Sequence, residues 1–288
     1  MTRQNPTIFA YLAMAVAAVW TLLPIYWMLR MATLIPADIS TYPPPLWPHH
    51  PHIGNLLNIL GFSYVTSDGL LLTAAGQSRQ IISGLINSSI VAGCTMIATL
   101  IIVVPLAYVF GRMEFRFKTA LFMAVLFAVA VPPVSTLIPF YSLFSDLGLT
   151  GTRTGLVLIT LTVTIPFVAW MLIGYFRNLP PVERLAMIDG LSRWEMFFKV
   201  MLPLARNGIT VAAIISFLFS WNEYVFATTL VNGTDATTLP AAASGFLFQQ
   251  PEPGHMAAAI CLSMLPAALV VFFLQRHIAE MNLVDPVR

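Results

Sequence analysis

Long apolar runs alternate with shorter polar connections along this chain. A membrane-spanning helix needs about 20 mostly apolar residues to cross roughly 30 Å of hydrocarbon. Six runs reach that length: residues 8–29, 82–110, 120–144, 155–176, 208–231 and 256–275. The pattern therefore predicts an all-α, polytopic membrane protein with six transmembrane helices.

Prolines recur inside these runs. They are Pro24, Pro105, Pro132, Pro133, Pro139, Pro166 and Pro266. Each one removes a backbone hydrogen bond and can kink its helix. Membrane helices tolerate proline in general, but prolines this frequent favour a bundle that bends during a cycle.

Composition supports the membrane interpretation. The 288 residues are 58% hydrophobic and 9% charged, with a mean hydropathy of +0.82. Soluble domains carry about 25% charged residues, so a soluble globular protein is excluded. Cys94 and Cys261 both fall in apolar runs, which indicates buried thiols and supports neither a disulfide nor a metal pair.

The positions of the positive charges predict the orientation. If the N-terminus is cytoplasmic, the inner segments hold eleven Lys and Arg residues and the outer segments hold three. The outer three are Arg30, Arg79 and Arg153. Because cytoplasmic segments are enriched in Lys and Arg, we expect both termini to be cytoplasmic.

Residues 31–80 are expected to form an outer loop, which contains Y-P-P-P-L-W-P-H-H-P-H at Tyr42–His52. Prolines this dense favour extended chain. His49, His50 and His52 could be metal ligands, but no carboxylate or Cys is adjacent and the helical spacing of ligands is absent. We therefore expect a solvent-exposed loop and no metal site.

Few polar residues interrupt the predicted spans. They are Asn87, Ser88, Ser216, Ser220, Asn222 and Glu223, and positions 216, 220 and 223 share one face of a helix. They could form an interhelical hydrogen-bond cluster or line a path for a polar solute. No series of buried Asp, Glu and His crosses the spans, so a proton relay is poorly supported.

The most charged segment is the connection 177–206. Leu179-Pro180-Pro181 should end the preceding span, and a short helix should run from Val182 to Ile188. Gly190 can adopt the left-handed conformation that closes a helix. Ser192 and Glu195 then predict a capping box, opening a second helix that stops at Pro203.

This unit has three interpretations: a docking element for a soluble partner, an amphipathic helix on the membrane surface, or a linker. The second helix carries Trp194, Phe197 and Phe198 beside basic residues, which suits the membrane interface. The first helix is short and has small side chains around its turn. We therefore expect the first helix and the turn to dock a partner.

The segment also resembles the cytoplasmic loop of ABC importer permeases, in which E-A-A, two residues and Asp-Gly precede a helix ending in Leu-Pro. Here Asp189-Gly190 and Leu202-Pro203 match in register, while Arg184 and Leu185 replace the Glu and the first Ala. Further stretches resemble the maltose-type carbohydrate subgroup: L-I-N-S-S at 85–89, P-L-A-Y-V-F-G-R-M-E-F at 105–115, L-I-P-F-Y at 137–141, L-G-L at 147–149, I-P-F-V-A-W at 165–170 and W-N-E-Y at 221–224.

The resemblance covers about residues 80–278. It implies half of a heteromeric permease in a bacterial or archaeal cytoplasmic membrane, surrounded by lipid. The implied partners are a second homologous permease subunit, an ATPase subunit dimer and an extracytoplasmic solute-binding protein, with no nucleic acid. The implied ATPase-coupling residues are Glu183, Arg184, Leu185, Ala186, Met187, Asp189, Gly190 and Leu191.

The resemblance also implies an organisation of the chain: residues 1–80 hold the first span and the outer loop, 81–280 the permease core with its coupling loop 177–206, and 281–288 a cytoplasmic tail that differs from the family's usual one. The chain has no phosphate-binding loop, so we expect no cofactor in it, and ATP and Mg to be bound by the partner ATPases. A membrane-embedded enzyme or a secondary transporter is the alternative, but catalytic motifs and buried ionisable chains are missing from the sequence.

Overall fold

The computed structural model describes residues 8–43, 45–48, 50–67, 69–249 and 251–280. The chain divides into two compact units. Unit 1 consists of residues up to 82 together with 242–265, and unit 2 consists of 83–241 together with the residues from 266 onward. The predicted tail at 281–288 lies outside the described residues.

Among the described residues, four helices are long and apolar enough to cross a membrane, and two bent helix pairs bring the number of candidate spans up to six. The four are α1 (Ile8–Ala32), α4 (Ser78–Arg112), α7 (Arg153–Arg177) and the apolar part of α15 (Pro253–Glu280). The predicted all-α membrane fold is confirmed.

The predicted span at 120–144 is not one straight helix. α5 (Lys118–Ala130) ends before Pro132, and a short 3-10 turn η1 (Pro133–Thr136) leads into α6 (Leu137–Asp146). The two parts are bent by 90°. Consecutive prolines explain the break, because neither can donate the backbone hydrogen bond that would continue α5.

The predicted span at 208–231 is also interrupted. α11 (Arg206–Trp221) ends at Trp221, and α12 (Val225–Leu230) begins after a short break. α11 forms its bent pair instead with the helical stretch Arg193–Leu204 that precedes it, at 74°. Hydropathy alone predicted a continuous span because the break, residues 222–224, is only three residues long and lies between two apolar runs.

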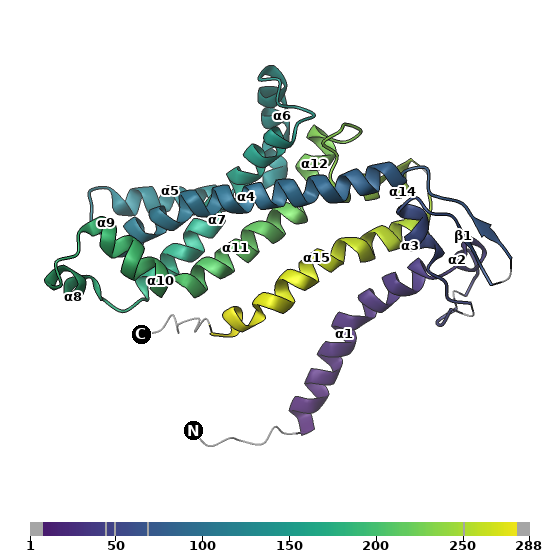
Figure 1. The fold of residues 1–288 in the computed structure, drawn as a ribbon, viewed down its shortest axis with the longest axis horizontal. Coiled ribbons are helices and arrows are strands. Elements are labelled where there is room, and N and C mark those ends of the chain that lie inside the picture. Colours follow the sequence, from purple (N-terminus) through teal and green to yellow (C-terminus); the bar gives the residue numbers. More distant parts are fainter. Residues whose placement is uncertain (1–7, 44, 49, 68, 250, 281–288) are drawn as a thin grey trace. The chain divides into compact units, whose positions relative to one another are not determined.

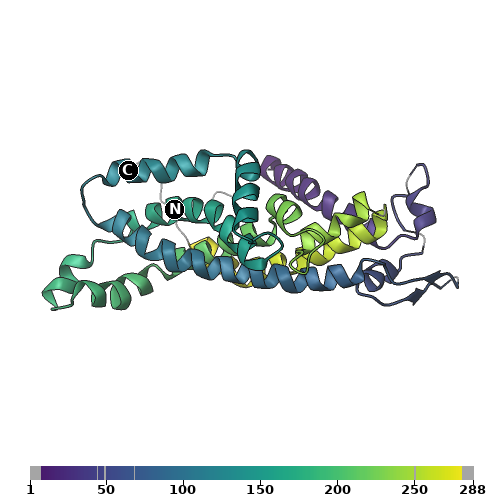
Figure 2. The ribbon, with the colours of Figure 1, turned by 90° about the horizontal axis from the view of Figure 1, so that it is seen from above.

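In unit 2, α7 packs against α5, α11 and α12, and α12 also contacts α6. Figures 1 and 2 show α8, α9 and α10 at one end of this unit, and Figure 1 shows α6 and α12 at the other. A cluster containing Phe144, Leu156 and Phe226 fills the α12 end. A second cluster, containing Tyr108 and Phe176, fills the α8 end.

Unit 1 contains α2 (Pro36–Ile39), α3 (Gly54–Ile59), α14 (Gly245–Phe248) and a small antiparallel hairpin of β1 (Tyr64–Val65) and β2 (Leu71–Leu72). α13 (Leu239–Ala243) belongs partly to each unit. The sequence pattern did not predict the hairpin.

The histidine-rich loop of unit 1 is only partly exposed. His50 is exposed, but His52 is buried, its Nδ1 atom accepts a 3.0 Å hydrogen bond from the backbone of Gly54, and its ring stacks on Tyr64. The prediction of an exposed loop was therefore wrong at His52, because its ring fills space beside the hairpin. His49 lies outside the described residues, within which no group of His, Cys, Asp and Glu could hold a metal.

Candidate coupling site

The first half of the connection 177–206 folds as a short helix closed by a glycine turn. α8 (Glu183–Ile188) is followed by Gly190 at φ +80°. The Gly190 N–H donates to the carbonyl of Met187, and the Leu191 N–H donates to the carbonyl of Ala186, both at 3.1 Å. These two bonds define a Schellman motif, which satisfies the last carbonyls of the helix.

The second half begins at the predicted capping box. The Ser192 hydroxyl accepts from the Glu195 N–H at 3.3 Å, and the Ser192 N–H donates to the Glu195 carboxylate at 3.1 Å. α9 (Arg193–Met196), a π-helical turn η2 (Phe197–Met201) and α10 (Leu202–Leu204) follow. The helix therefore continues through Pro203 rather than stopping there, and the π turn before it accommodates the missing N–H.

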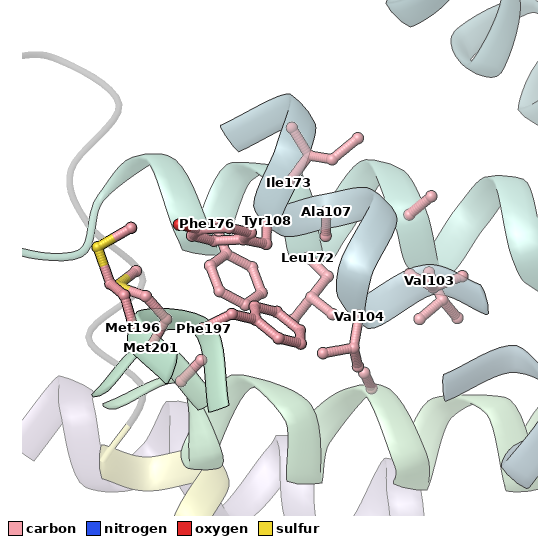
Figure 3. Packing of buried hydrophobic residues seen from close by; sticks show 14 of the residues in the cluster. Val103, Val104, Ala107, Tyr108, Leu172, Ile173, Phe176, Met196, Phe197 and Met201 are labelled. Carbon is pink, nitrogen blue, oxygen red and sulfur yellow. The ribbon is translucent and has the colours of Figure 1, made fainter. Parts of the chain in front are cut away.

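One face of this second half is buried in unit 2. Phe197 packs against Tyr108 of α4 with 5.1 Å between ring centroids, and Tyr108 also meets Phe176 of α7 at 6.1 Å (Figure 3). The prediction that Phe197 lies at the membrane interface was therefore wrong. Trp194 and Phe198 remain exposed and stack on each other.

α8 presents the opposite situation, because most of its side chains have no cover within the chain. Ala186 is buried, but Leu185, Met187 and Ile188 are 64%, 55% and 81% exposed. Arg184, Asp189 and Gly190 are also exposed. We call the exposed set of Arg184, Leu185, Met187, Ile188 and Asp189 the coupling surface.

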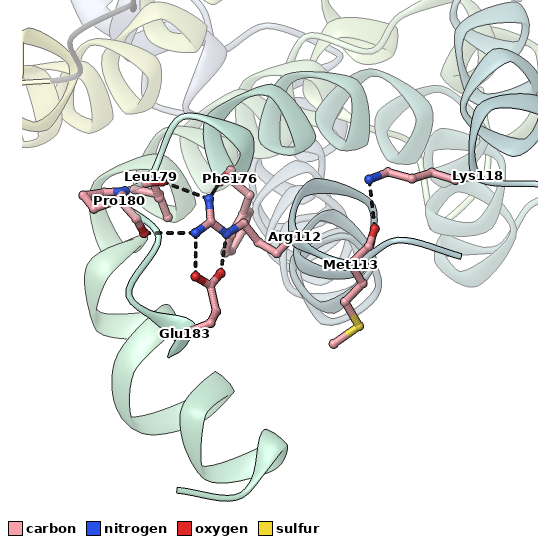
Figure 4. A network of polar contacts seen from close by, with 7 residues as sticks. All are labelled: Arg112, Met113, Lys118, Phe176, Leu179, Pro180 and Glu183. Carbon is pink, nitrogen blue, oxygen red and sulfur yellow. Dashed lines mark hydrogen bonds and ion pairs between the residues drawn. The ribbon is translucent and has the colours of Figure 1, made fainter. Parts of the chain in front are cut away.

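Glu183 points towards Arg112, the last residue of α4, and pairs with it (Figure 4). The guanidinium binds the carboxylate through two nitrogens, of which Nη2 lies 2.6 Å from Oε2. Hydrogen bonding to Arg112 lowers the pKa of Glu183 below its usual value.

Arg112 also holds the end of α7. Its Nη1 donates to the carbonyls of Leu179 at 2.9 Å and Phe176 at 3.3 Å, and its Nη2 donates to the carbonyl of Pro180 at 3.0 Å. Sequence reasoning assigned no role to Arg112 or Tyr108. Both lie in the stretch 105–115 that carries the family resemblance, and their spacing of four residues places them on one helix face.

The residues predicted for a solute path make hydrogen bonds within unit 2. The Asn87 side chain donates to the carbonyls of Asp235 and Thr237, and the Ser88 hydroxyl accepts from the Leu239 N–H. The Ser220 hydroxyl donates to that of Thr95 at 3.3 Å. Two local bonds join side chains of α11 and its C-cap to backbone carbonyls: Ser216 to Ala212, and Asn222 to Leu218.

Glu223 does not share the α11 face with Ser216 and Ser220, since α11 ends at Trp221. Its two carboxylate oxygens accept 2.8 Å hydrogen bonds from the N–H groups of Phe226 and Ala227. Glu223 therefore caps the first turn of α12.

Comparison with known proteins decides the family. Residues 103–280 match the family described as "Binding-protein-dependent transport system inner membrane component". The chain belongs to this family. It is an inner-membrane, multi-pass permease subunit of an ABC importer, and such subunits are non-catalytic, which sets aside the enzyme and secondary-transporter alternatives.

Individual relatives agree with this assignment. The chain is 29% identical over 278 residues to the diacetylchitobiose uptake system permease protein NgcG of Streptomyces coelicolor, covering 94% of this chain and 86% of NgcG. It is 32% identical to the trehalose transport system permease protein SugB of Mycobacterium tuberculosis, covering 68% and 73% of the two chains.

A solved structure has the same fold. A chain in the crystal structure of a bacterial ABC transporter involved in the import of the acidic polysaccharide alginate superposes with a TM-score of 0.75 at 18% identity, covering 96% of this chain and 99% of that one. The similarity supports the helical arrangement described above.

Proposed function

We propose that this permease subunit forms half of the path for a sugar or a related polar solute, and that α8 with its glycine turn couples it to an ATPase. The main support for the coupling role is the coupling surface, which is exposed, largely apolar and at one end of unit 2. The sugar class is supported by the relatives' names, which specify diacetylchitobiose and trehalose.

The complete transporter would contain a second permease subunit, two ATPase subunits that bind ATP and Mg, and an extracytoplasmic solute-binding protein. The name of the family supports the binding protein. Residues 81–280 would act as the transport core. The excess of positive charge on the predicted inner segments supports cytoplasmic termini and a cytoplasmic position for the coupling surface.

Energy has to enter this subunit through contact, since its sequence has no phosphate-binding loop. Closure of the ATPases on ATP would displace α8 and tilt the spans from inward-facing to outward-facing. Docking is favourable on physical grounds, because covering an exposed Leu, Met or Ile side chain contributes on the order of 1 kcal/mol or more. The prolines inside α4 and α7 would help those helices bend.

Cross-linking tests the docking directly. In a transporter whose Cys94 and Cys261 have been replaced by Ala, Ile188→Cys labelled with a maleimide-linked benzophenone should form a photo-cross-link to the ATPase. Ile138→Cys is the matched control, because Ile138 is also 81% exposed but belongs to α6, which Figure 1 shows well away from α8. Equal cross-linking at both positions, or cross-linking at Ile138 alone, would contradict the proposal.

A backbone variant tests the glycine turn. Gly190→Val forces a β-branched residue into a left-handed conformation, which costs roughly 1–2 kcal/mol and should distort the turn. Gly233→Val is the control, since Gly233 has φ +73° and, as at Gly190, no atom lies within 4 Å of an added Cβ. We expect Gly190→Val to abolish uptake and coupled ATP hydrolysis and Gly233→Val to preserve both; full uptake and full coupling in Gly190→Val would refute the role of the turn.

The solute class needs its own assay. The purified transporter, reconstituted with its binding protein, should hydrolyse ATP faster when a di- or oligosaccharide panel is added. An amino-acid panel at the same concentrations serves as the control. Stimulation by amino acids alone would overturn the sugar assignment without affecting the docking proposal.

A further inference from the structure

The last turn of α4 contacts both halves of the coupling loop. Tyr108 and Arg112 are four residues apart and therefore lie on the same helix face. Arg112 binds Glu183 at the start of α8, and Tyr108 packs on Phe197 after α9. α4 is not adjacent in the sequence to either half of the loop, so these side chains contact the loop across the fold.

The Arg112 contact has the geometry of a rigid joint. One guanidinium binds a carboxylate through two nitrogens and also reaches the carbonyls of Phe176, Leu179 and Pro180. The carbonyls at the end of a helix lack intrahelical partners and favour a cation. The Arg112 and Glu183 side chains are only 10% and 19% exposed, so water screens the pair less than it screens a surface pair.

The Tyr108 contact is apolar and lies beside this joint. Its ring packs between Phe176 of α7 and Phe197 of η2, and all three residues are buried. Aromatic pairs at these separations prefer defined relative orientations, which restrains sliding of one helix over another. Close-packed protein interiors transmit a displacement instead of absorbing it.

We propose that Tyr108 and Arg112 are the positioning residues that transmit displacement of the coupling loop to α4. The proposal rests on the proposed function, in which an ATPase displaces α8. α7 and α11 flank the coupling loop in the chain and are pulled directly, whereas α4 is not its neighbour in the chain and receives the displacement at its last turn through these two side chains. All three helices then move together in response to one contact.

The test separates transmission from stability by measuring solute transported per ATP hydrolysed in proteoliposomes containing the whole transporter. Arg112→Lys keeps the charge but loses the fork that binds carboxylate and carbonyls together. We expect it to lower solute transported per ATP at least fivefold. Arg116→Lys is the matched control, because Arg116 is exposed and makes none of these contacts. An unchanged ratio in Arg112→Lys would overturn the proposal.

Tyr108 is tested with a pair of variants. Tyr108→Phe keeps both ring contacts and should preserve the ratio, while Tyr108→Leu removes them and should lower it. Equal ratios in these two variants would contradict the aromatic half of the proposal. A Tyr108→Leu protein that transports less only because less complex assembles would keep its ratio of solute to ATP.

A covalent bridge in place of the Arg112–Glu183 ion pair tests the same contact if Arg112→Lys fails to assemble. In the background lacking Cys94 and Cys261, Arg112→Cys combined with Glu183→Cys should uncouple transport, and a short bis-maleimide bridge between the two should restore solute transported per ATP. Failure of the bridge to restore it, or a bridge that blocks uptake, would overturn the rigid joint.

The cross-link at Ile188→Cys distinguishes failure of this inference from failure of the proposed function. If Arg112→Lys still forms the cross-link to the ATPase but transports less solute per ATP hydrolysed, both proposals are supported. If the cross-link forms and the ratio is unchanged, only the joint is wrong. If the cross-link never forms in the parent transporter, the docking proposal fails first.

Discussion

The Nε atom of Arg153 donates a 2.7 Å hydrogen bond to Oδ1 of Asn87. The amide nitrogen of Asn87 donates in turn to the carbonyls of Asp235 at 2.8 Å and Thr237 at 2.7 Å. Asn87 is only 1% exposed. One side chain of α4 thus ties the first turn of α7 to the loop that follows α12, which favours the hydrogen-bond cluster over the solute path as the role of Asn87.

Asn87→Ala should therefore destabilise the subunit and leave its solute preference unchanged. The side chain loses three hydrogen bonds, and at the modest value measured for such bonds between membrane helices the cost is roughly 2 kcal/mol. Equilibrium unfolding in detergent micelles measures this cost. Asn222→Ala is the control, because Asn222 is exposed and makes a single bond to Leu218, so its effect should be small. A changed Michaelis constant for the solute with unchanged stability would instead support the path.

Glu223 allows a second prediction, which separates capping from solute binding. Glu223→Ala removes both acceptors for the N–H groups at the start of α12 and should cost about 0.5–2 kcal/mol, the usual range for loss of a helix cap. Glu223→Gln keeps one acceptor oxygen and should cost about half as much by the same unfolding measurement. If the negative charge itself served the solute, Gln and Ala would impair uptake equally.

Features set by neighbouring residues could be predicted from the sequence. The Gly190 turn and the capping box of Ser192 and Glu195 follow from rules that act over three to five residues, and both were found. The apolar runs predicted the helices, and Pro132 and Pro133 indicated a kink, but hydropathy does not detect where a helix ends, so residues 120–144 and 208–231 were each predicted as one continuous span.

Contacts between distant residues could not be predicted in this way. Arg112 and Glu183 are 71 positions apart, and nothing in the local pattern distinguishes a carboxylate that faces α4 from one that faces a partner. Glu183 was therefore grouped with the coupling residues, whereas its carboxylate binds Arg112. Phe197 was assigned to the membrane interface for the same reason, since its burial depends on Tyr108.

In the resemblance to the E-A-A motif of ABC importer permeases, Arg184 stands in place of the Glu, and it is exposed on the coupling surface. We expect it to face an acidic residue of the partner ATPase. An exposed ion pair contributes about 0.2–1 kcal/mol, so Arg184→Ala should reduce coupled ATP hydrolysis by roughly up to fivefold at low salt and less at high salt. Arg184→Glu should reduce it further, and a basic substitution on the ATPase should rescue that variant.

The control for this prediction is Arg193→Ala, because Arg193 is also exposed but belongs to α9 and not to the coupling surface. Its effect on coupled hydrolysis should be small at every salt concentration. Full coupling in Arg184→Ala at low salt would show that the residue carries no contact with the ATPase.

The pairing of Arg112 with Glu183 predicts a dependence of stability on pH. Hydrogen bonding to the guanidinium lowers the pKa of Glu183 in the folded protein below its ordinary value of 4.5. A carboxylate with a depressed pKa stabilises the folded state fully above the unfolded value, and this contribution is lost as the pH falls through the folded value. The Arg112–Glu183 ion pair should therefore weaken when the pH falls below about 4.5.

Glu183→Gln isolates this contribution, because it removes the charge at nearly constant volume. The difference in unfolding free energy between the parent protein and Glu183→Gln should be constant from pH 7 down to about pH 5 and should shrink at lower pH. Glu114→Gln is the control: Glu114 pairs with Lys118, but its side chain is 91% exposed, so its removal should change stability little at any pH. The difference in unfolding free energy could instead stay constant or grow towards pH 3. That result would contradict an ionised Glu183 held by Arg112, because protonation of the carboxylate removes the ion pair.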